Sequence, residues 1–185
     1  MILLRHGQSE FNLHFTKTRR DPGIKDPKLT PLGHQQAEAA AEALAGRDIR
    51  RIIASPYTRA IQTALPTARR LGLPLTITPT VRERYAFACD IGTPVSRLRM
   101  EFPDLSFPEM DEMWWPAVEE PAEQVEARAR LFRAEMAALD DWAHTLVVSH
   151  WGFILAFTGQ SVNNGQILEV DPTADHPAEV VWKHH

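Results

Sequence analysis

Three short apolar segments of this chain are each followed by arginine or histidine side chains. Arg5 and His6 follow the first segment, Arg59 the second and His150 the third. Burying such groups without an anion partner costs several kcal/mol, so core packing does not explain their placement. A planar guanidinium group holds two oxygen atoms of one anion at once. These residue types therefore indicate a site for a dianionic oxyanion such as a phosphoryl group.

The same residues can also perform chemistry on that group. Nearby cations disfavour imidazolium, so a histidine beside arginines is neutral, and a neutral imidazole nitrogen is a nucleophile. Attack on phosphorus would give a phosphohistidine, while Arg5, Arg59 and the second histidine neutralise the equatorial oxygens. The leaving oxygen needs a proton. Glu83 is the best-placed acid and could later activate the incoming water.

The apolar segments that precede these residues are typical of buried parallel strands. They cover residues 2–4, 51–54 and 145–148. Weaker strand candidates cover residues 75–78, 167–170 and 180–182. In open α/β sheets, ligands bind beyond the carboxyl ends of the strands. If the three best strands are neighbours, the arginines and histidines meet at one edge of the sheet.

Helical patterns alternate with the strand candidates. Four helices are predicted, over about residues 31–45, 57–71, 122–139 and 151–158. Thr30 and Pro31 are typical of a helix start, and Pro66 should kink or interrupt the second helix. Strands that alternate with helices predict an α/β fold, a three-layer sandwich with a mostly parallel central sheet flanked by helices.

Two stretches do not fit this alternation. Residues 86–120 are rich in proline and aromatic residues, and we expect a cap-like insertion at about 85–120 that covers the pocket. Within it, Trp114 and Trp115 either stack on a substrate or anchor the insertion to the body, and anchoring is the more common role. Residues 15–28 are irregular and basic, and the cluster there either binds a second anionic group or forms a solvated face. The basic residues of that cluster are Lys17, Arg19 and Arg20.

Length and composition limit the class of protein. The chain has 185 residues, which predicts a single domain over residues 1–185. A net charge of −4 argues against a nucleic-acid-coating protein, and one cysteine excludes an internal disulfide framework. No apolar run approaches the length of a membrane span and no signal peptide is visible, so a cytoplasmic protein is expected. A monomer and a homodimer both remain open.

Five motifs together resemble those of the histidine phosphatase superfamily, which is also named after the cofactor-dependent phosphoglycerate mutases. They occur in the family's order and span most of the chain. The motifs are residues 4–12 (LRHGQSEFN), 29–37 (LTPLGHQQA), 55–64 (SPYTRAIQTA), 82–84 (RER) and 148–152 (VSHWG).

The resemblance implies a role for each matching residue. It implies His6 as the phosphorylated nucleophile and Glu83 as proton donor and acceptor. It implies that the phosphate is bound by Arg5, Asn12, Arg59 and His150. No metal and no cofactor are expected, and the partner is a small phosphorylated substrate. Gln8 stands where many members have glutamate, a variation that the family tolerates.

Hydrolysis is favoured over the family's other activities. The mutases are longer, with a larger insertion after the acid/base segment, whereas no cation follows Arg84 here until Arg97. A mutase-type phosphotransferase and a non-catalytic module that binds phosphorylated ligands remain as alternatives. The binding module is disfavoured because neither His6 nor Glu83 is substituted.

Other kinds of site have less support. A site of two histidines and one carboxylate could hold a metal, but Arg5 and Arg59 would repel a divalent cation. A cysteine phosphatase is excluded because Val95 stands where Cys89 would need an arginine. The chain contains no Walker loop and no Gly-x-Ser-x-Gly motif.

Overall fold

The apolar segments predicted as strands pair in one sheet in the computed structural model, which describes residues 1–182. The strand order is β3-β2-β4-β1-β5, and β5 is the antiparallel member. The strands are β1 (Ile2–Arg5), β2 (Arg51–Ala54), β3 (Leu75–Ile77), β4 (Thr145–Ser149) and β5 (Ile167–Glu169). The mostly parallel sheet is confirmed, and β4 lies between β1 and β2 as the site requires.

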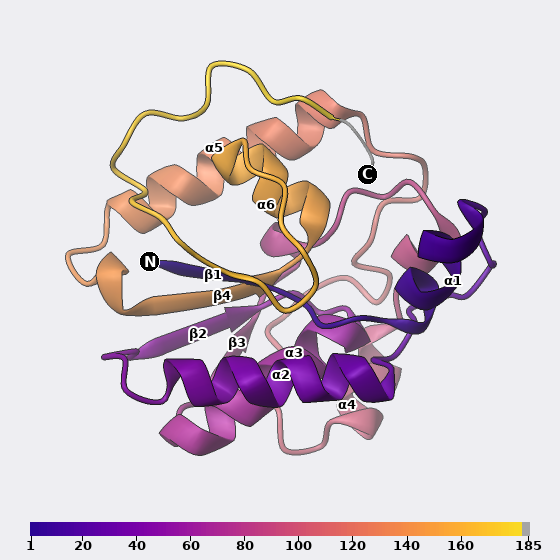
Figure 1. Ribbon diagram of the computed structural model, residues 1–185, viewed down its shortest axis with the longest axis horizontal. Helices are drawn as coiled ribbons and strands as arrows, with labels where there is room; N and C mark the ends of the chain where they lie inside the picture. Colours follow the sequence, from indigo (N-terminus) through magenta and orange to yellow (C-terminus); the bar gives the residue numbers. More distant parts are fainter. Residues whose placement is uncertain (183–185) are drawn as a thin grey trace.

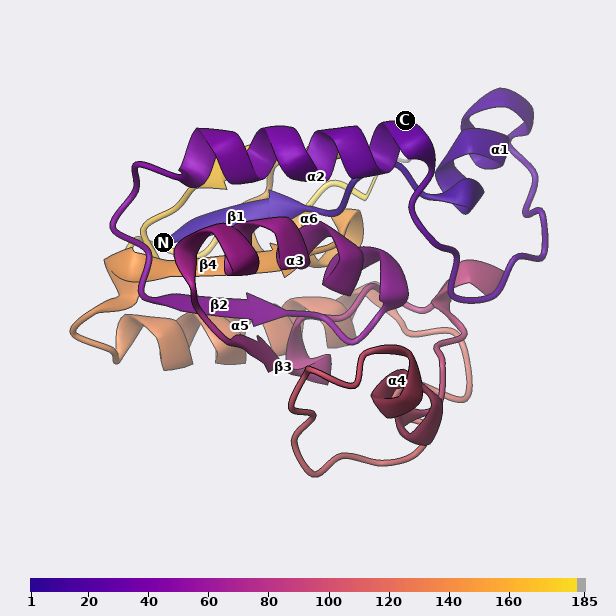
Figure 2. The same ribbon diagram turned by 90° about the horizontal axis from the view of Figure 1, so that it is seen from below.

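Helices cover both faces of this sheet, as Figures 1 and 2 show. The helices are α1 (Glu10–Thr18), α2 (Pro31–Leu44), α3 (Thr58–Leu71), α4 (Val95–Glu101), α5 (Ala122–Ala137) and α6 (Trp151–Thr158). Three 3₁₀ turns span residues 79–81, 88–90 and 142–144. Helices α2 and α3 lie on one face, and α5 and α6 on the other. The three-layer α/β sandwich is therefore confirmed.

Successive side chains of the central strands pack on opposite faces of the sheet, so the core consists of two clusters. Ile2 and Leu4 of β1 pack into the cluster beneath α2 and α3, whereas Leu3 packs into the cluster beneath α5 and α6. Successive side chains of a strand point to opposite faces, so a strand buried on both sides reads as a continuous apolar run. This explains why the three central strands were visible in the sequence.

The start of α2 follows the signal predicted from the sequence, whereas two other predictions fail. Thr30 caps α2, with its hydroxyl oxygen accepting a hydrogen bond from the Gly33 amide at 3.1 Å. The predicted interruption of α3 is wrong, because the helix continues through Pro66. The strand predicted over residues 180–182 is also wrong, since no regular element is present there.

Helix α1 has no counterpart among the predicted elements. Its first residues belong to the first motif, and its C-terminal part falls in the stretch expected to be irregular. Ser9 and Asn12 form a capping box, and the chain leaves the helix at Arg19 in the left-handed conformation. Of its nine residues only Phe11 is buried, so the sequence offers no repeated apolar positions by which this helix could be predicted.

The stretch over residues 86–120 packs mainly against the core beside β3, where α4 lies in Figure 2. Trp114 is buried, its ring meets the Tyr57 ring edge-on at 4.6 Å, and its indole nitrogen donates to the Thr93 carbonyl oxygen at 2.9 Å. Trp114 thus anchors this stretch to the body of the protein. No helix within residues 1–182 is both long enough and apolar enough to cross a bilayer.

Candidate active site

The carboxyl ends of β1, β4 and β2 deliver the predicted side chains to one edge of the sheet. The rings of His6 and His150 lie with their centroids 5.1 Å apart. A cavity of about 410 Å³ opens at this edge. Five of the six predicted site residues line it, namely Arg5, His6, Asn12, Arg59 and Glu83. His150 is completely buried and lies behind the lining, against His6.

His6 is held in one tautomer. Its Nδ1 lies 2.7 Å from the Gly7 carbonyl oxygen, which can only accept, so Nδ1 carries the proton and Nε2 keeps its lone pair. Burial lowers the pKa of His6 well below 6.5, and the charges of Arg59 and Arg5 lower it further. His6 is therefore a neutral imidazole with a nucleophilic Nε2.

His150 is also neutral but has different partners. Its Nε2 lies 2.8 Å from the hydroxyl oxygen of Ser55, a residue that the sequence reasoning did not select. Its Nδ1 is buried and has no hydrogen-bond partner within residues 1–182. Burial lowers the pKa of His150 well below 6.5, and Arg59 and His6 add to the shift. One ring nitrogen thus remains available for a ligand.

Arg59 is buried and is fixed by the segment that follows Glu83. Its guanidinium donates to the Cys89 carbonyl oxygen at 2.9 Å and to an Asp90 carboxylate oxygen at 3.2 Å, and it lies 4.3 Å above the Tyr57 ring. Burial raises the pKa of Asp90 to about 6, against the opposing charge of Arg59. No sequence signal distinguished Asp90, because it lies in an irregular segment.

Arg5 and Asn12 complete the anion-binding side of the cavity. Arg5 donates to the Val162 carbonyl oxygen at 2.6 Å, and its buried Nε has no partner within residues 1–182. Burial lowers the pKa of Arg5 to about 10, so the guanidinium stays charged at neutral pH. The Asn12 carbonyl oxygen accepts from the Asn164 amide at 3.2 Å, which leaves the Asn12 amide group to donate to an anion.

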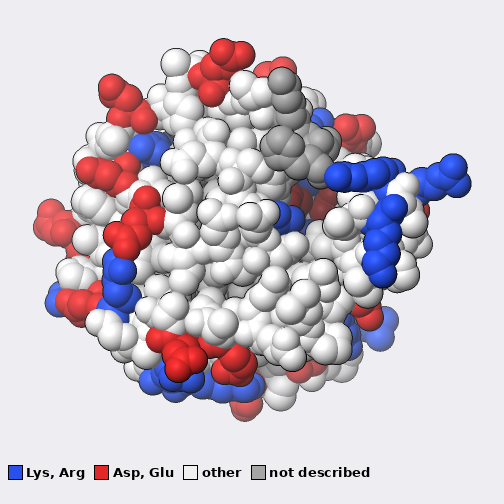
Figure 3. All heavy atoms as spheres, viewed as in Figure 1, with Lys and Arg blue, Asp and Glu red and all other residues white. Residues whose placement is uncertain are grey.

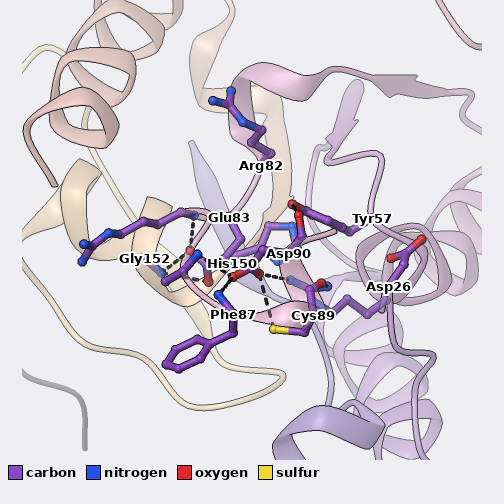
Figure 4. Close-up of polar contacts among 12 residues, drawn as sticks. Asp26, Tyr57, Arg82, Glu83, Phe87, Cys89, Asp90, His150 and Gly152 are labelled. Carbon is purple, nitrogen blue, oxygen red and sulfur yellow. Dashed lines mark hydrogen bonds and ion pairs between the residues drawn. The ribbon is translucent and has the colours of Figure 1, made fainter. Parts of the chain in front are cut away.

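Glu83 is held at the N-terminus of α6, as Figure 4 shows. Its carboxylate accepts hydrogen bonds from the Gly152 amide at 2.9 Å and from the Arg84 amide at 2.8 Å. A β-carbon at residue 152 would collide with Glu83 Oε1, so only glycine lets the helix approach this closely. The glycine of the last motif therefore positions the acid of the preceding one.

Only one residue of the basic cluster formed by Lys17, Arg19 and Arg20 borders the cavity. Figure 3 shows basic side chains on the side of the molecule where α1 projects from the body in Figure 1. Arg19 lines the cavity, whereas Lys17 and Arg20 are exposed and do not. The two tryptophans expected as possible stacking partners, Trp114 and Trp115, do not line it either. Of the expected insertion, only residues within 86–90 border the cavity, so the insertion does not cover it as predicted.

The predicted residues bring two guanidinium groups, one neutral imidazole and one carboxyl group to the cavity, and the second neutral imidazole, that of His150, lies directly behind His6. Such a set can bind a tetrahedral dianion, attack it and exchange a proton with its ester oxygen. Within residues 1–182, no three histidine, cysteine, aspartate or glutamate residues are grouped so that they could hold a metal ion.

Comparisons with known proteins agree with this geometry. The model of the histidine phosphatase superfamily (branch 1) matches residues 1–179. Glucosyl-3-phosphoglycerate phosphatase from Mycolicibacterium vanbaalenii is 30% identical over 91% of this chain and 78% of its own length. A 2,3-bisphosphoglycerate-dependent phosphoglycerate mutase from Bartonella tribocorum is 44% identical, but over only 38% of this chain and 32% of its own.

The fold is also shared with solved structures. The mycobacterial glucosyl-3-phosphoglycerate phosphatase complexed with VO₃ superposes with a TM-score of 0.65 and 26% identity, over 90% of this chain and 88% of that one. The family match covers nearly the whole chain, and it includes every segment that contributes to the cavity. This protein therefore belongs to the histidine phosphatase superfamily.

Proposed function

We propose that this protein is a metal-independent phosphomonoester hydrolase in which His6 Nε2 becomes phosphorylated. One observation carries the proposal. The Gly7 carbonyl oxygen fixes the proton on Nδ1, so the opposite nitrogen is an unprotonated nucleophile in a cavity lined by Arg5 and Arg59. These arginines, with Asn12 and the free Nδ1 of His150, would hold the three non-bridging phosphoryl oxygens.

The reaction has two steps in this proposal. In the first, Nε2 bonds to phosphorus, the phosphorus–oxygen ester bond breaks, and the protonated Glu83 carboxyl donates its proton to the leaving alcohol. In the second, the Glu83 carboxylate takes a proton from water, the resulting hydroxide attacks phosphorus, and the nitrogen–phosphorus bond breaks. Phosphate leaves, and His6 and the protonated Glu83 are restored.

Hydrolysis is favoured over phosphoglycerate mutase activity by the extent of the matches. The phosphatases are similar over most of the chain, whereas the mutase from Bartonella tribocorum matches over 38% of it. We take a small phosphorylated metabolite as the substrate, because the relatives are named for one and the cavity has the size of a small-molecule site.

A phosphoenzyme experiment tests the proposal. Brief mixing with a ³²P-labelled phosphomonoester should label the protein, and the label should be lost in acid and kept in hydroxide, as for a phosphohistidine. His6→Ala should lose both labelling and turnover, by at least about 10³-fold. His34→Ala, which removes an exposed histidine on α2, is the matched control and should behave like the wild type.

Two results would contradict the proposal. A label that resists acid but is lost in alkali would indicate an acyl phosphate on a carboxylate instead. Turnover that EDTA abolishes and a divalent cation restores would indicate a metal-dependent reaction.

A further inference from the structure

The cavity has more room than a phosphoryl group needs. Its volume of about 410 Å³ falls within the range of roughly 300–1,000 Å³ typical of sites for small organic ligands. The residues assigned above to the phosphoryl group come from the carboxyl ends of the strands and from the start of α1. The rest of the lining must therefore contact the alcohol part of the substrate.

Three phenylalanine rings form one wall of this remaining space. The rings of Phe11 and Phe15 on α1 are stacked at 5.0 Å, and the Phe87 ring lies 5.5 Å from the first and 5.1 Å from the second. All three line the cavity. This phenylalanine wall joins α1 to the segment that follows Glu83.

Hydrogen bonds hold the Phe87 part of the wall in register with the proposed phosphoryl site, and Asn12 joins the α1 part to it. One Asp90 carboxylate oxygen accepts from the amides of Ala86 and Phe87, each at 3.0 Å, while the other accepts from Arg59. Figure 4 shows the Phe87 ring pointing away from that carboxylate. On the α1 side, Asn12 lines the cavity one residue after Phe11. The wall is therefore preorganised with respect to the bound phosphoryl group.

The other contributions to the outer cavity are mostly polar. They come from the segment after Glu83, the start of α6, the loop over residues 161–164 and the end of α1. They include Thr16, Arg19, Arg84, Trp151, Ser161 and Asn163. A ligand in this space meets the phenylalanine wall and the Trp151 side chain together with hydrogen-bonding and cationic groups.

We propose that the phenylalanine wall selects phosphomonoesters whose alcohol carries a flat, apolar ring, which stacks on Phe15 and Phe87. This inference rests on the proposed hydrolase function and adds the substrate class. Offset or edge-on contact between aromatic rings contributes free energy beyond the burial of apolar area, so a ring should bind better than a flexible chain of similar size.

The test compares 2-phenylethyl phosphate with n-hexyl phosphate, since both are esters of primary alcohols with a sizeable apolar group. The wild type should favour the ring-bearing ester about fivefold in kcat/KM, equivalent to about 1 kcal/mol. Phe87→Leu keeps an apolar side chain but removes the ring, and should bring the ratio close to one. Phe102→Leu removes a partly buried ring that does not line the cavity, so its ratio should stay at the wild-type value.

Binding of the corresponding phosphonates separates this inference from the function on which it rests. Calorimetry should give the same fivefold preference for 2-phenylethylphosphonate over n-hexylphosphonate, and Phe87→Leu should remove it. Equal affinities in the wild type, or a preference that Phe87→Leu leaves intact, would overturn the inference. If neither ester is hydrolysed while the phosphonates are discriminated, the proposed function fails and the binding specificity stands.

Discussion

The two histidines beside the cavity show how burial and neighbouring cations set protonation. His6 and His150 are both buried next to Arg59, and both effects disfavour the charged imidazolium. The two imidazole rings differ in their hydrogen-bond partners. The carbonyl of Gly7 fixes the tautomer of one, and the hydroxyl of Ser55 contacts the other. In the proposed mechanism, the ring of His6 attacks phosphorus and the ring of His150 contacts a phosphoryl oxygen.

We expect both histidines to remain neutral at pH values at which an exposed histidine is protonated. The ring signals of His6 and His150 in NMR spectra should not shift as the pH falls from 8 to 6, because their pKa values lie well below 6.5. A midpoint near 6.5 for His6 would contradict the electrostatic argument.

Replacement of the proposed acid should depend on the leaving group. Glu83→Gln should lower kcat/KM for an alkyl phosphate by about 10²–10⁴-fold, because an alkoxide needs a proton as it departs. The loss should be smaller for p-nitrophenyl phosphate, whose leaving group is stable as an anion. Steady-state kinetics with both esters measure this difference. Equal losses would show that Glu83 does not donate the proton.

At the scale of elements, close approach between the α6 N-terminus and the segment with Glu83 positions the acid. The Gly152 amide donates a hydrogen bond to the Glu83 carboxyl group and so fixes its position beside the cavity. Glycines also permit close contact between residue 7 and residue 33, where a β-carbon on either would collide with backbone of the other segment. The start of α2 is thus held against the chain just after the nucleophile.

Gly152→Ala tests the first of these contacts. The added methyl group would displace the Glu83 carboxylate, so turnover of an alkyl phosphate should fall by about 10²-fold or more, with a smaller loss for p-nitrophenyl phosphate. Gly46→Ala is the matched control, because a β-carbon there meets no atom within 4 Å. Wild-type kinetics for Gly152→Ala would show that the exact position of α6 is unimportant.

At the scale of the whole molecule, the buried ionisable groups link stability to pH. His6 and His150 bind protons less readily in the folded than in the unfolded protein, so folding loses stability as the pH falls below 6.5. Asp90 acts in the opposite direction. Burial raises its pKa to about 6, above the ordinary 3.8, so protonation between these values favours the folded state. Burial also raises the pKa of Asp26, so two carboxyl groups oppose the two histidines.

Removing one histidine should flatten this dependence. In His150→Asn, the slope of unfolding free energy against pH between 6.5 and 5.5 should decrease by up to about 1.4 kcal/mol per pH unit, because one fewer proton is taken up on unfolding. Urea unfolding in phosphate-free buffers measures the slope, whatever the absolute stability of the variant. Parallel curves for variant and wild type would mean that His150 is protonated alike in both states.

The sequence by itself determined the parts of this protein whose signals are local. Continuous apolar runs marked the central strands, capping residues marked the start of α2, and the residue types after each strand indicated phosphoryl chemistry. Helix α1 and the absence of a strand at 180–182 were not predicted, and α3 was predicted but shows no interruption at Pro66. In these places the local pattern was weak or tertiary packing overrode it.

Only the tertiary structure decided which distant residues meet. Strand order depends on pairing between segments up to a hundred or more residues apart, and no local pattern encodes the placement of β4 between β1 and β2. The same holds for Ser55 against His150, for Asp90 against Arg59, and for the rings of the phenylalanine wall. These residues lie in loops or on α1, and their roles depend on contacts with residues that are distant in the sequence and become neighbours only in the folded protein.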